Sequence, residues 1–192
     1  MRNILLIEPN YSNKYPPIGL MKIATYHRML GDKVRFFKGD LKDLVVDELW
    51  QDCLIDLAFI DPSINWNLKQ ASIKRYIKNK NIQILIDLEL ENNKTESFIL
   101  SKLADYADNF KKKEYLKSPK FDRIYVTTLF TFYWKITIET IQFCKKLVKS
   151  QDQILVGGVL ASLLHKEVEL ATGIKPMQGL LDKAGMLDPE NP

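Results

Sequence analysis

The chain has 192 residues, of which 46% are hydrophobic and 27% charged, enough for one domain, or one domain with an appendage, around a substantial core. Gly and Pro together make up only 8 + 8 residues, which excludes wholesale disorder, collagen-like repeats and low-complexity sequence. The net charge of +4 comes from 23 Lys and 5 Arg against 24 acidic residues. Because nucleic-acid readers usually cluster Arg, we expect no nucleic-acid partner.

Two cysteines, Cys53 and Cys144, lie far apart, with no Cys-x-x-Cys motif and no His at ligand spacing. We therefore expect neither a disulfide framework nor a structural zinc site. The protein is expected in a reducing compartment. The first apolar run is too short for a signal-peptide core, and no apolar stretch reaches the length of a membrane span. The sequence thus predicts a cytoplasmic protein with no membrane partner.

The first third of the chain has the pattern of a βαβ unit. Asn3–Glu8 is a short apolar run that predicts a buried strand, and the loop Pro9–Pro17 follows it. Apolar residues at helical spacing begin at Ile18, and Gly31 ends the predicted helix. A second strand is expected at Val34–Phe37. Strands joined in this way lie parallel in one sheet.

The middle of the chain predicts further helices and one strand. Leu57–Ile60 fits either a short strand or the end of the helix before it. The other expected elements are helices at Leu44–Leu54, Leu68–Lys80 (exposed and Lys-rich) and Glu96–Lys112, and a strand at Ile82–Asp87.

The last third continues the alternation with a strand at Arg123–Thr128, a helix at Trp134–Lys149 and a strand at Gln153–Val156. This order predicts an α/β fold with a doubly wound, mostly parallel, flavodoxin-like (Rossmann-like) sheet and helices on both faces. From Gly173 onward the periodicity is lost and turn-prone residues dominate, so we expect residues 173–192 to be a linker-like tail after a domain spanning 1–172.

Ligands of open parallel sheets bind at the carboxyl ends of the strands. Those ends carry Glu8–Asn10, Thr127–Thr131 and Gly157-Gly158, where glycines admit close approach and hydroxyls can donate or accept. Gly157-Gly158 also fits a tight turn without a ligand, and two Thr in a strand also fit simple β propensity.

The sequence lacks several familiar sites. It has no Gly-x-Gly-x-x-Gly after a strand, no P-loop and no Ser/Thr-rich phosphate loop after the first strand. His27 and His165 lack a nucleophile or metal motif around them, and both are expected at the surface or the edge of the core. We therefore predict no catalytic residue and no metal ligand in this chain.

Three stretches together resemble the cobalamin-binding-type domain of bacterial radical S-adenosylmethionine proteins. The first, IEPNYSNKYPPIGLMKIATYHRMLGDKVRFFKGD, carries the Pro-Pro-Ile-Gly-Leu turn into a helix and the Gly-Asp before a second strand. The second, DRIYVTTLFTFYWKITIETI, places Thr127-Thr128-Leu129 at the family's Ser-x-Leu position. The third, ILVGGVLASLLHKEVELATGIKPMQGLLD, resembles the Gly-Gly turn and the helix after it. Residues 41–120 match less well and look like an elaboration.

The resemblance implies an accessory amino-terminal domain of a radical S-adenosylmethionine iron–sulfur enzyme. Its partner would be a catalytic barrel with a four-iron cluster bound by Cys-x-x-x-Cys-x-x-Cys, a motif that this sequence lacks. We therefore expect the chain to be a piece of a longer enzyme, not catalytic by itself. The iron–sulfur cluster and S-adenosylmethionine would belong to the parent protein's other part.

The resemblance also implies a cofactor site. The loop after the first strand lacks the His that ligates cobalt in domains of the methionine-synthase type, and many members of the group bind cobalamin without that ligand or do not bind it. The expected cofactor-binding residues are Pro9, Asn10, Tyr15, Gly19, Thr127, Thr128, Leu129, Gly157, Gly158 and Ser162.

Two other functions remain open at this stage. In the first, the domain binds no ligand and docks against the barrel to shape substrate access, through the aromatic run Phe130, Phe132, Tyr133 and Trp134. Exposure of two of these rings would favour docking. The second is a receiver-like signalling domain, which is disfavoured because the double acid and the Lys after the last strand are missing.

Overall fold

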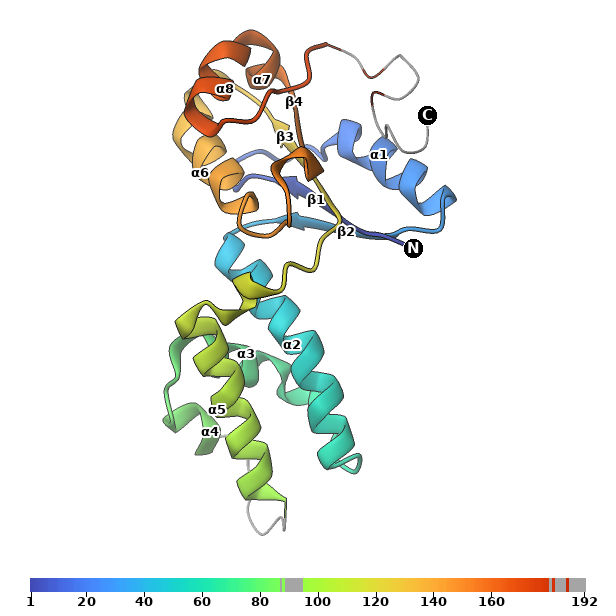
Figure 1. Ribbon diagram of the computed structural model, residues 1–192. Helices are drawn as coiled ribbons and strands as arrows, with labels where there is room; N and C mark the ends of the chain where they lie inside the picture. The colour runs from blue at the N-terminus through green and yellow to red at the C-terminus, as the bar shows by residue number, and fades with distance from the viewer. Residues whose placement is uncertain (87, 89–94, 180, 182–185, 187–192) are drawn as a thin grey trace. The chain divides into compact units, whose positions relative to one another are not determined.

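The chain divides into two compact units. The computed structural model describes residues 1–86, 88, 95–179, 181 and 186. Unit 1 consists of Met1–Asp40 and Pro119–Pro192, and unit 2 consists of Leu41–Ser118 (Figure 1). Unit 2 therefore occupies nearly the same interval as the stretch 41–120 that fits the resemblance least. The tail expected at 173–192 is described through Gly179, and most of its remainder lies outside the described residues.

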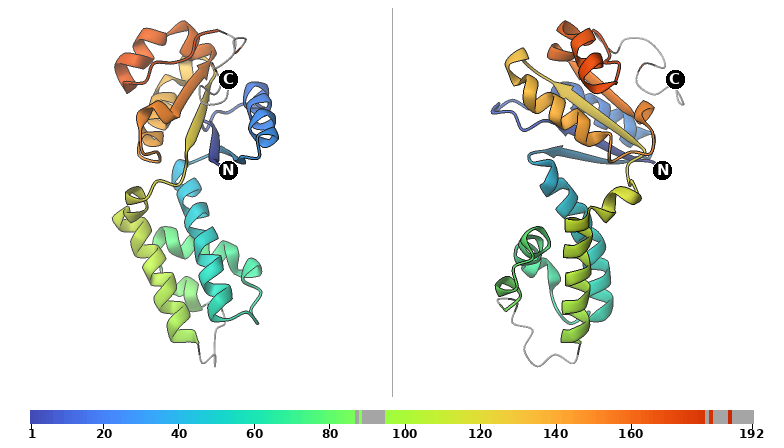
Figure 2. Two further views of the ribbon diagram at one scale, coloured as in Figure 1. Left: turned by 45° about the vertical axis from the view of Figure 1, so that its right-hand side comes forward. Right: turned by 60° about the vertical axis from the view of Figure 1, so that its left-hand side comes forward.

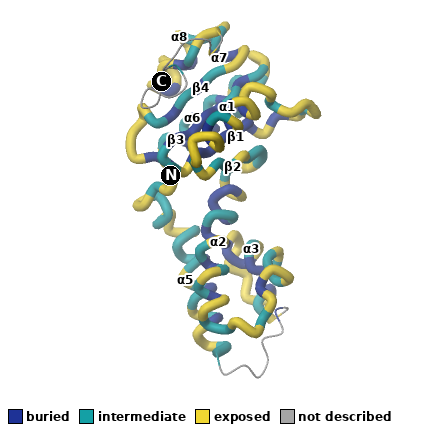
Figure 3. The backbone as a smooth tube through the Cα atoms, turned by 90° about the vertical axis from the view of Figure 1, so that its right-hand side faces the viewer, coloured by how far each residue is buried: buried dark blue, intermediate teal, exposed yellow. Residues whose placement is uncertain are grey.

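Unit 1 contains a sheet of four parallel strands in the order β2-β1-β3-β4. The central strand β1 is buried on both faces, and Ile4 to Ile7 have almost no exposed surface, as the dark blue stretch in Figure 3 shows. Continuous apolar runs of this kind are expected where helices cover both faces of a parallel sheet. The strands are β1 (Asn3–Glu8), β2 (Lys33–Lys38), β3 (Arg123–Thr128) and β4 (Ile154–Gly158).

Helices cover the two faces of this sheet. Helix α1 (Ile18–Met29) packs its apolar stripe on the face that Ile4, Leu6 and Tyr125 form. Helix α6 (Trp134–Cys144) lies on the opposite face (Figure 2). This arrangement confirms the predicted doubly wound α/β fold of the Rossmann or flavodoxin type.

The carboxyl-terminal part of unit 1 folds against the far edge of the sheet. Helix α7 (Val159–Leu163) starts directly after β4, and α8 (His165–Thr172) packs against α6 and α7. Helix α6 is shorter than the predicted Trp134–Lys149, because turns follow Cys144 and lead to the 3-10 helix η4 (Gln151–Gln153). Ser150 and Gln153 form a capping box that fixes the start of that helix.

Unit 2 is helical and has its own core. Helices α2, α3 and α5 pack on one another (Figures 1 and 2). Trp50, Leu57, Ile73, Ile99 and Leu103 are buried between them. Salt bridges from Lys74 and Lys78 of α3 to Asp47 and Asp43 of α2 flank that core. The elements are α2 (Leu41–Ile60), η1 (Trp66–Lys69), α3 (Gln70–Asn79), α4 (Gln83–Ile86), α5 (Glu96–Lys112) and η2 (Glu114–Lys117).

The strand predicted at Ile82–Asp87 is wrong. Residues 83–86 form the short helix α4, in which Ile84 is buried and Ile86 is exposed; Ile82, just before this helix, is also exposed. A short run of Ile and Leu fits a buried strand and a helical turn equally well, and periodicity cannot separate the two. Asp87 lies outside the described residues.

Two helix predictions also change in extent. The expected helix Leu44–Leu54 is the middle of the longer α2, so Leu57–Ile60 ends that helix and forms no strand. The expected helix Leu68–Lys80 is divided between η1 and α3, and it is not exposed throughout, because Ile73 and Tyr76 are buried.

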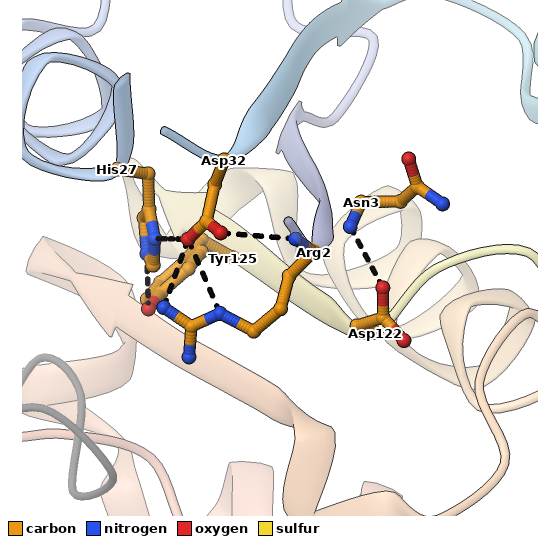
Figure 4. Close-up of polar contacts among 6 residues, drawn as sticks. All are labelled: Arg2, Asn3, His27, Asp32, Asp122 and Tyr125. Atoms are coloured by element: carbon orange, nitrogen blue, oxygen red, sulfur yellow. Dashed lines mark hydrogen bonds and ion pairs between the residues drawn. The ribbon is translucent and has the colours of Figure 1, made fainter. Parts of the chain in front are cut away.

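A polar network holds the amino-terminal edge of the sheet in unit 1 (Figure 4). Asp32 accepts hydrogen bonds from the side chain and the backbone amide of Arg2, the closest at 2.8 Å. His27 Nδ1 lies 2.9 Å from the same carboxylate, and its Nε2 lies 2.8 Å from the hydroxyl of Tyr125. His27 is fully buried, which corrects the expected position at the surface or the edge of the core.

The Asp32 carboxylate is held in its charged form. Burial raises its pKa, but the hydrogen bonds from Arg2 and His27 outweigh that effect and hold the pKa well below its usual range. A depressed carboxyl pKa contributes stability that is fully present above the unfolded-state pKa of about 3.9 and is lost as the pH falls from there toward the folded-state pKa.

We predict that Asp32→Asn lowers the free energy of unfolding by about 2–3 kcal/mol at pH 7, because charged hydrogen bonds contribute about 1.5–3 kcal/mol. The difference from wild type should shrink as the pH falls below about 4, where the unfolded-state carboxyl becomes protonated. Urea denaturation at pH 7, 5 and 3 measures both effects. A difference that does not change with pH would contradict the assigned role of the charge.

Candidate functional site

The carboxyl-terminal edge of the sheet gathers the ends of β1, β3 and β4. Parallel pairing puts Thr127 beside Gly157 and Thr128 beside Gly158. Of the ten expected cofactor-binding residues, four are therefore direct neighbours by strand register. Leu129 joins them, because its carbonyl accepts a hydrogen bond from the amide of Leu160 at 2.8 Å.

Thr128 links the strand ends to the start of α7. Its buried hydroxyl donates to the carbonyl of Gly157 at 3.0 Å and accepts from the amide of Ala161 at 2.9 Å. These bonds satisfy one of the amides that a helix start leaves unpaired. The Thr128 hydroxyl is thus engaged within the protein and holds the turn between β4 and α7.

Gly158 is required by the backbone. Its φ is +109°, and a Cβ there would overlap the carbonyl oxygen of Thr128 and lie 2.8 Å from the Thr128 nitrogen. Only glycine combines this dihedral angle with so close an approach of two strands. The tight-turn interpretation therefore accounts for Gly158 without a ligand.

Gly157 has no such requirement. No described atom beyond its chain neighbours lies within 4 Å of the position that a Cβ would take, and its φ is not in the left-handed region. Glycine in a strand weakens the strand and often marks a place where a ligand approaches the backbone closely. The packing of the described residues therefore does not require a glycine at position 157.

Four further expected residues lie in the loop after β1 and at the start of α1, and they differ in burial. Pro9 is buried at the end of the central strand, whereas Asn10, Tyr15 and Gly19 are exposed. No described atom beyond its chain neighbours and the adjoining backbone of α1 lies within 4 Å of the position that a Cβ would take at Gly19. The structure thus buries Pro9 directly after the end of β1 and leaves the other three on the surface of the loop and of the first turn of α1.

A lysine on β2 fixes this loop. Lys38 Nζ donates to Asn13 Oδ1 at 2.6 Å and to the Asn13 carbonyl at 3.0 Å, and it pairs with the buried Glu8 at 3.1 Å. Glu8 and Lys38 are neighbours in the strand register. Lys38 was not predicted from the sequence. A glutamate and a lysine at the ends of two consecutive parallel strands do, however, indicate an ion pair between them.

Ser162, the last expected residue, lies in α7, and its hydroxyl accepts a hydrogen bond from the amide of Gly179 at 3.3 Å. The same segment contacts β4, because the amide of Met177 donates to the carbonyl of Val156 at 2.7 Å. The chain after α8 therefore returns along the outer edge of β4 and engages Ser162 from within the protein.

A row of aromatic rings begins in the core and ends on the surface. The ring of Tyr11 stacks on that of Tyr133, with ring centroids 4.6 Å apart. The centroid of Tyr133 lies 4.5 Å from that of Phe132, whose ring stacks on Phe130 with centroids 5.3 Å apart. Burial raises the pKa of Tyr11 to about 12, and its hydroxyl is 2.6 Å from that of Thr137. Phe130 and Phe132 are 53% and 73% exposed. Sequence analysis did not assign Tyr11, the buried end of this row, to the site.

The described residues offer no cluster of His, Cys, Asp and Glu that could hold a metal ion. Cys53 and Cys144 are both buried free thiols, and burial raises the pKa of Cys53 to about 12, so neither is an activated nucleophile. In the described parts of the chain, no helix is long and apolar enough to cross a membrane.

Comparison with known proteins identifies no relative of this chain. No family model matches the sequence, and neither the curated proteins nor the solved structures contain a match to it. The site must therefore be interpreted from its own geometry.

We predict opposite effects for the two adjacent glycines. Gly158→Ala should lower the free energy of unfolding by about 3 kcal/mol or more, because the new Cβ is strained and overlaps Thr128. Gly157→Ala should leave the stability unchanged or raise it by up to about 1 kcal/mol, because alanine restricts the unfolded chain more than glycine does. Thermal and urea denaturation of both variants measure this. Equal destabilisation by the two would show that Gly157 also has a packing role.

Proposed function

We propose that unit 1 is a cofactor-binding accessory domain of the cobalamin-binding type, serving a radical S-adenosylmethionine iron–sulfur enzyme of bacterial type. The fold supports this proposal, because a doubly wound parallel sheet binds ligands at the carboxyl ends of its strands. The three stretches that resemble the family supply the β1 loop with the start of α1, the end of β3, and the turn from β4 into α7.

The observation that carries the proposal is the open backbone at Gly157. The space that a Cβ would fill is free of described atoms, directly beside Thr127 and at the edge where ligands of such sheets bind. A bulky polar cofactor needs backbone groups that it can approach closely, and Gly157 provides them. The residues at this edge therefore fit one end of an extended organic cofactor.

The same residues do not fit coordination of a metal by the protein. The loop 9–17 has no His, and Glu8, the acidic residue at the end of β1, is buried and paired with Lys38. Cobalamin would accordingly be held through the backbone at Gly157 and through Thr127, Leu129 and the loop residues Asn10 and Tyr15, without a protein ligand on cobalt. When bound, cobalamin supplies cobalt-centred group or electron transfer.

The chain's own part in such an enzyme would be to bind and orient the cofactor. This sequence has no Cys-x-x-x-Cys-x-x-Cys, so the cluster that cleaves S-adenosylmethionine is assigned to another part of the parent protein. Thr128 would act indirectly, because its hydroxyl fixes the turn that presents Gly157.

A second candidate function is favoured by the exposure of Phe130 and Phe132. In it, unit 1 binds no ligand, and these rings dock against a catalytic barrel. Exposed aromatic side chains are frequent anchors of protein interfaces. Cofactor binding by the wild-type chain decides between the two functions.

The test is a titration of the full chain with hydroxocobalamin, followed by the shift of its visible absorption. We predict saturable binding by wild type and at least tenfold weaker binding by Gly157→Val, because the valine side chain occupies the space beside Thr127. The control Lys33→Val adds the same β-branched side chain at the amino-terminal edge of the sheet and should bind like wild type.

Two results would contradict the proposal. A wild-type titration that shows no absorption change at high protein concentration would exclude cobalamin as the ligand and favour the docking function. Equal binding by wild type and Gly157→Val, with both proteins folded by circular dichroism, would support cofactor binding but exclude this edge of the sheet as the binding site.

A further inference from the structure

We infer that Phe130 and Phe132 form a stacking surface for a planar heteroaromatic ring of the ligand. This inference goes beyond the open backbone at Gly157 to the chemical class of one part of the ligand. It rests on the proposed function only in placing a ligand at the carboxyl-terminal edge of the sheet.

The two rings are held in a fixed arrangement. Phe130 directly precedes the 3-10 helix η3 (Thr131–Tyr133) and Phe132 lies within it; their ring planes differ by 12°, and their centroids are 5.3 Å apart. The row continues through Tyr133 to the buried Tyr11, whose hydroxyl contacts that of Thr137. In the described part of the chain the row ends at Phe130. A planar ring that stacks there extends an existing stack and orders no further side chain.

The charge around the rings favours a neutral ring system over a polyanion. Residues 127–134 read TTLFTFYW and contain no charged side chain. Proteins that bind single-stranded nucleic acid combine stacking rings with a positively charged groove along the backbone. This segment has the rings without such a run of charge.

The size of the two-ring surface matches one planar ring of a small ligand. A phenylalanine ring buries about 150–250 Å² at most, so two rings give less than the roughly 800 Å² that each partner contributes to a stable protein interface. One planar ring of a cofactor, in contrast, is covered by one or two aromatic side chains.

The position of the rings links them to the open backbone. Phe130 is two residues beyond Thr128, which pairs with Gly158. The residue between them, Leu129, accepts the hydrogen bond of Leu160 and thereby joins the loop to the first turn of α7. A ligand that contacts Gly157 and carries a planar ring can therefore reach both features from one edge of the sheet.

The experiment uses 5,6-dimethylbenzimidazole and flavin mononucleotide as planar probes without cobalt. Binding to the full chain is followed by NMR, through saturation transfer and upfield ring-current shifts of the probe protons. We expect Phe130→Leu and Phe132→Leu to weaken binding about tenfold, because stacking contributes strongly per ring. Phe130→Tyr and Phe132→Tyr keep the π face and should restore it. Phe98→Leu, at an exposed phenylalanine of unit 2, is the matched control and should bind like wild type.

Equal binding by the leucine and wild-type proteins overturns the inference, and so does the absence of binding of both probes at millimolar concentration. Binding of the probes that depends on the two rings, together with a flat hydroxocobalamin titration, supports the stacking surface while rejecting cobalamin as the ligand. The two proposals can thus fail separately.

Discussion

The close approach of Gly158 to Thr128 determines the geometry of the carboxyl-terminal edge. At this point the backbone of β4 lies so near that of β3 that no Cβ fits between them. The Thr128 hydroxyl then joins the carbonyl of Gly157 to the amide of Ala161, so one side chain fixes both the strand end and the first turn of α7. The direction in which the chain leaves β3 and β4 follows from this contact, and with it the positions of Phe130 and of the open backbone at Gly157.

The two edges of the sheet have different roles. At the amino-terminal edge, Asp32 accepts hydrogen bonds from Arg2 and contacts His27, which stabilises the fold. At the carboxyl-terminal edge, the polar groups of Thr128 and Ser162 are engaged within the protein. Among the described residues, no atom beyond its chain neighbours lies within 4 Å of a Cβ position at Gly157, and the rings of Phe130 and Phe132 are largely exposed. Gly157 and these two rings are therefore positioned to contact a ligand.

Much of the fold could be predicted from the sequence, and some of the site could not. Asn3–Glu8 and Arg123–Thr128 have the predicted bounds because each is a short apolar or β-branched run between turn residues. The strand predicted at Ile82–Asp87 is wrong because this short apolar run packs as a helical turn in unit 2. Gly157 and Gly158 look alike in the sequence, and only the strand pairing separates them. Likewise, only the strand register shows that Lys38 of β2 lies beside Glu8, where it can donate to the loop residue Asn13.

We propose that a cofactor lies over the carboxyl-terminal edge of unit 1. The most direct measurement maps the backbone amide resonances of the isotopically labelled chain as hydroxocobalamin is added. We expect the largest shifts to cluster at residues 127–130 and 157–162 and the resonances of unit 2 to be unchanged. Shifts confined to unit 2 or to the Arg2–Asp32 edge would contradict it.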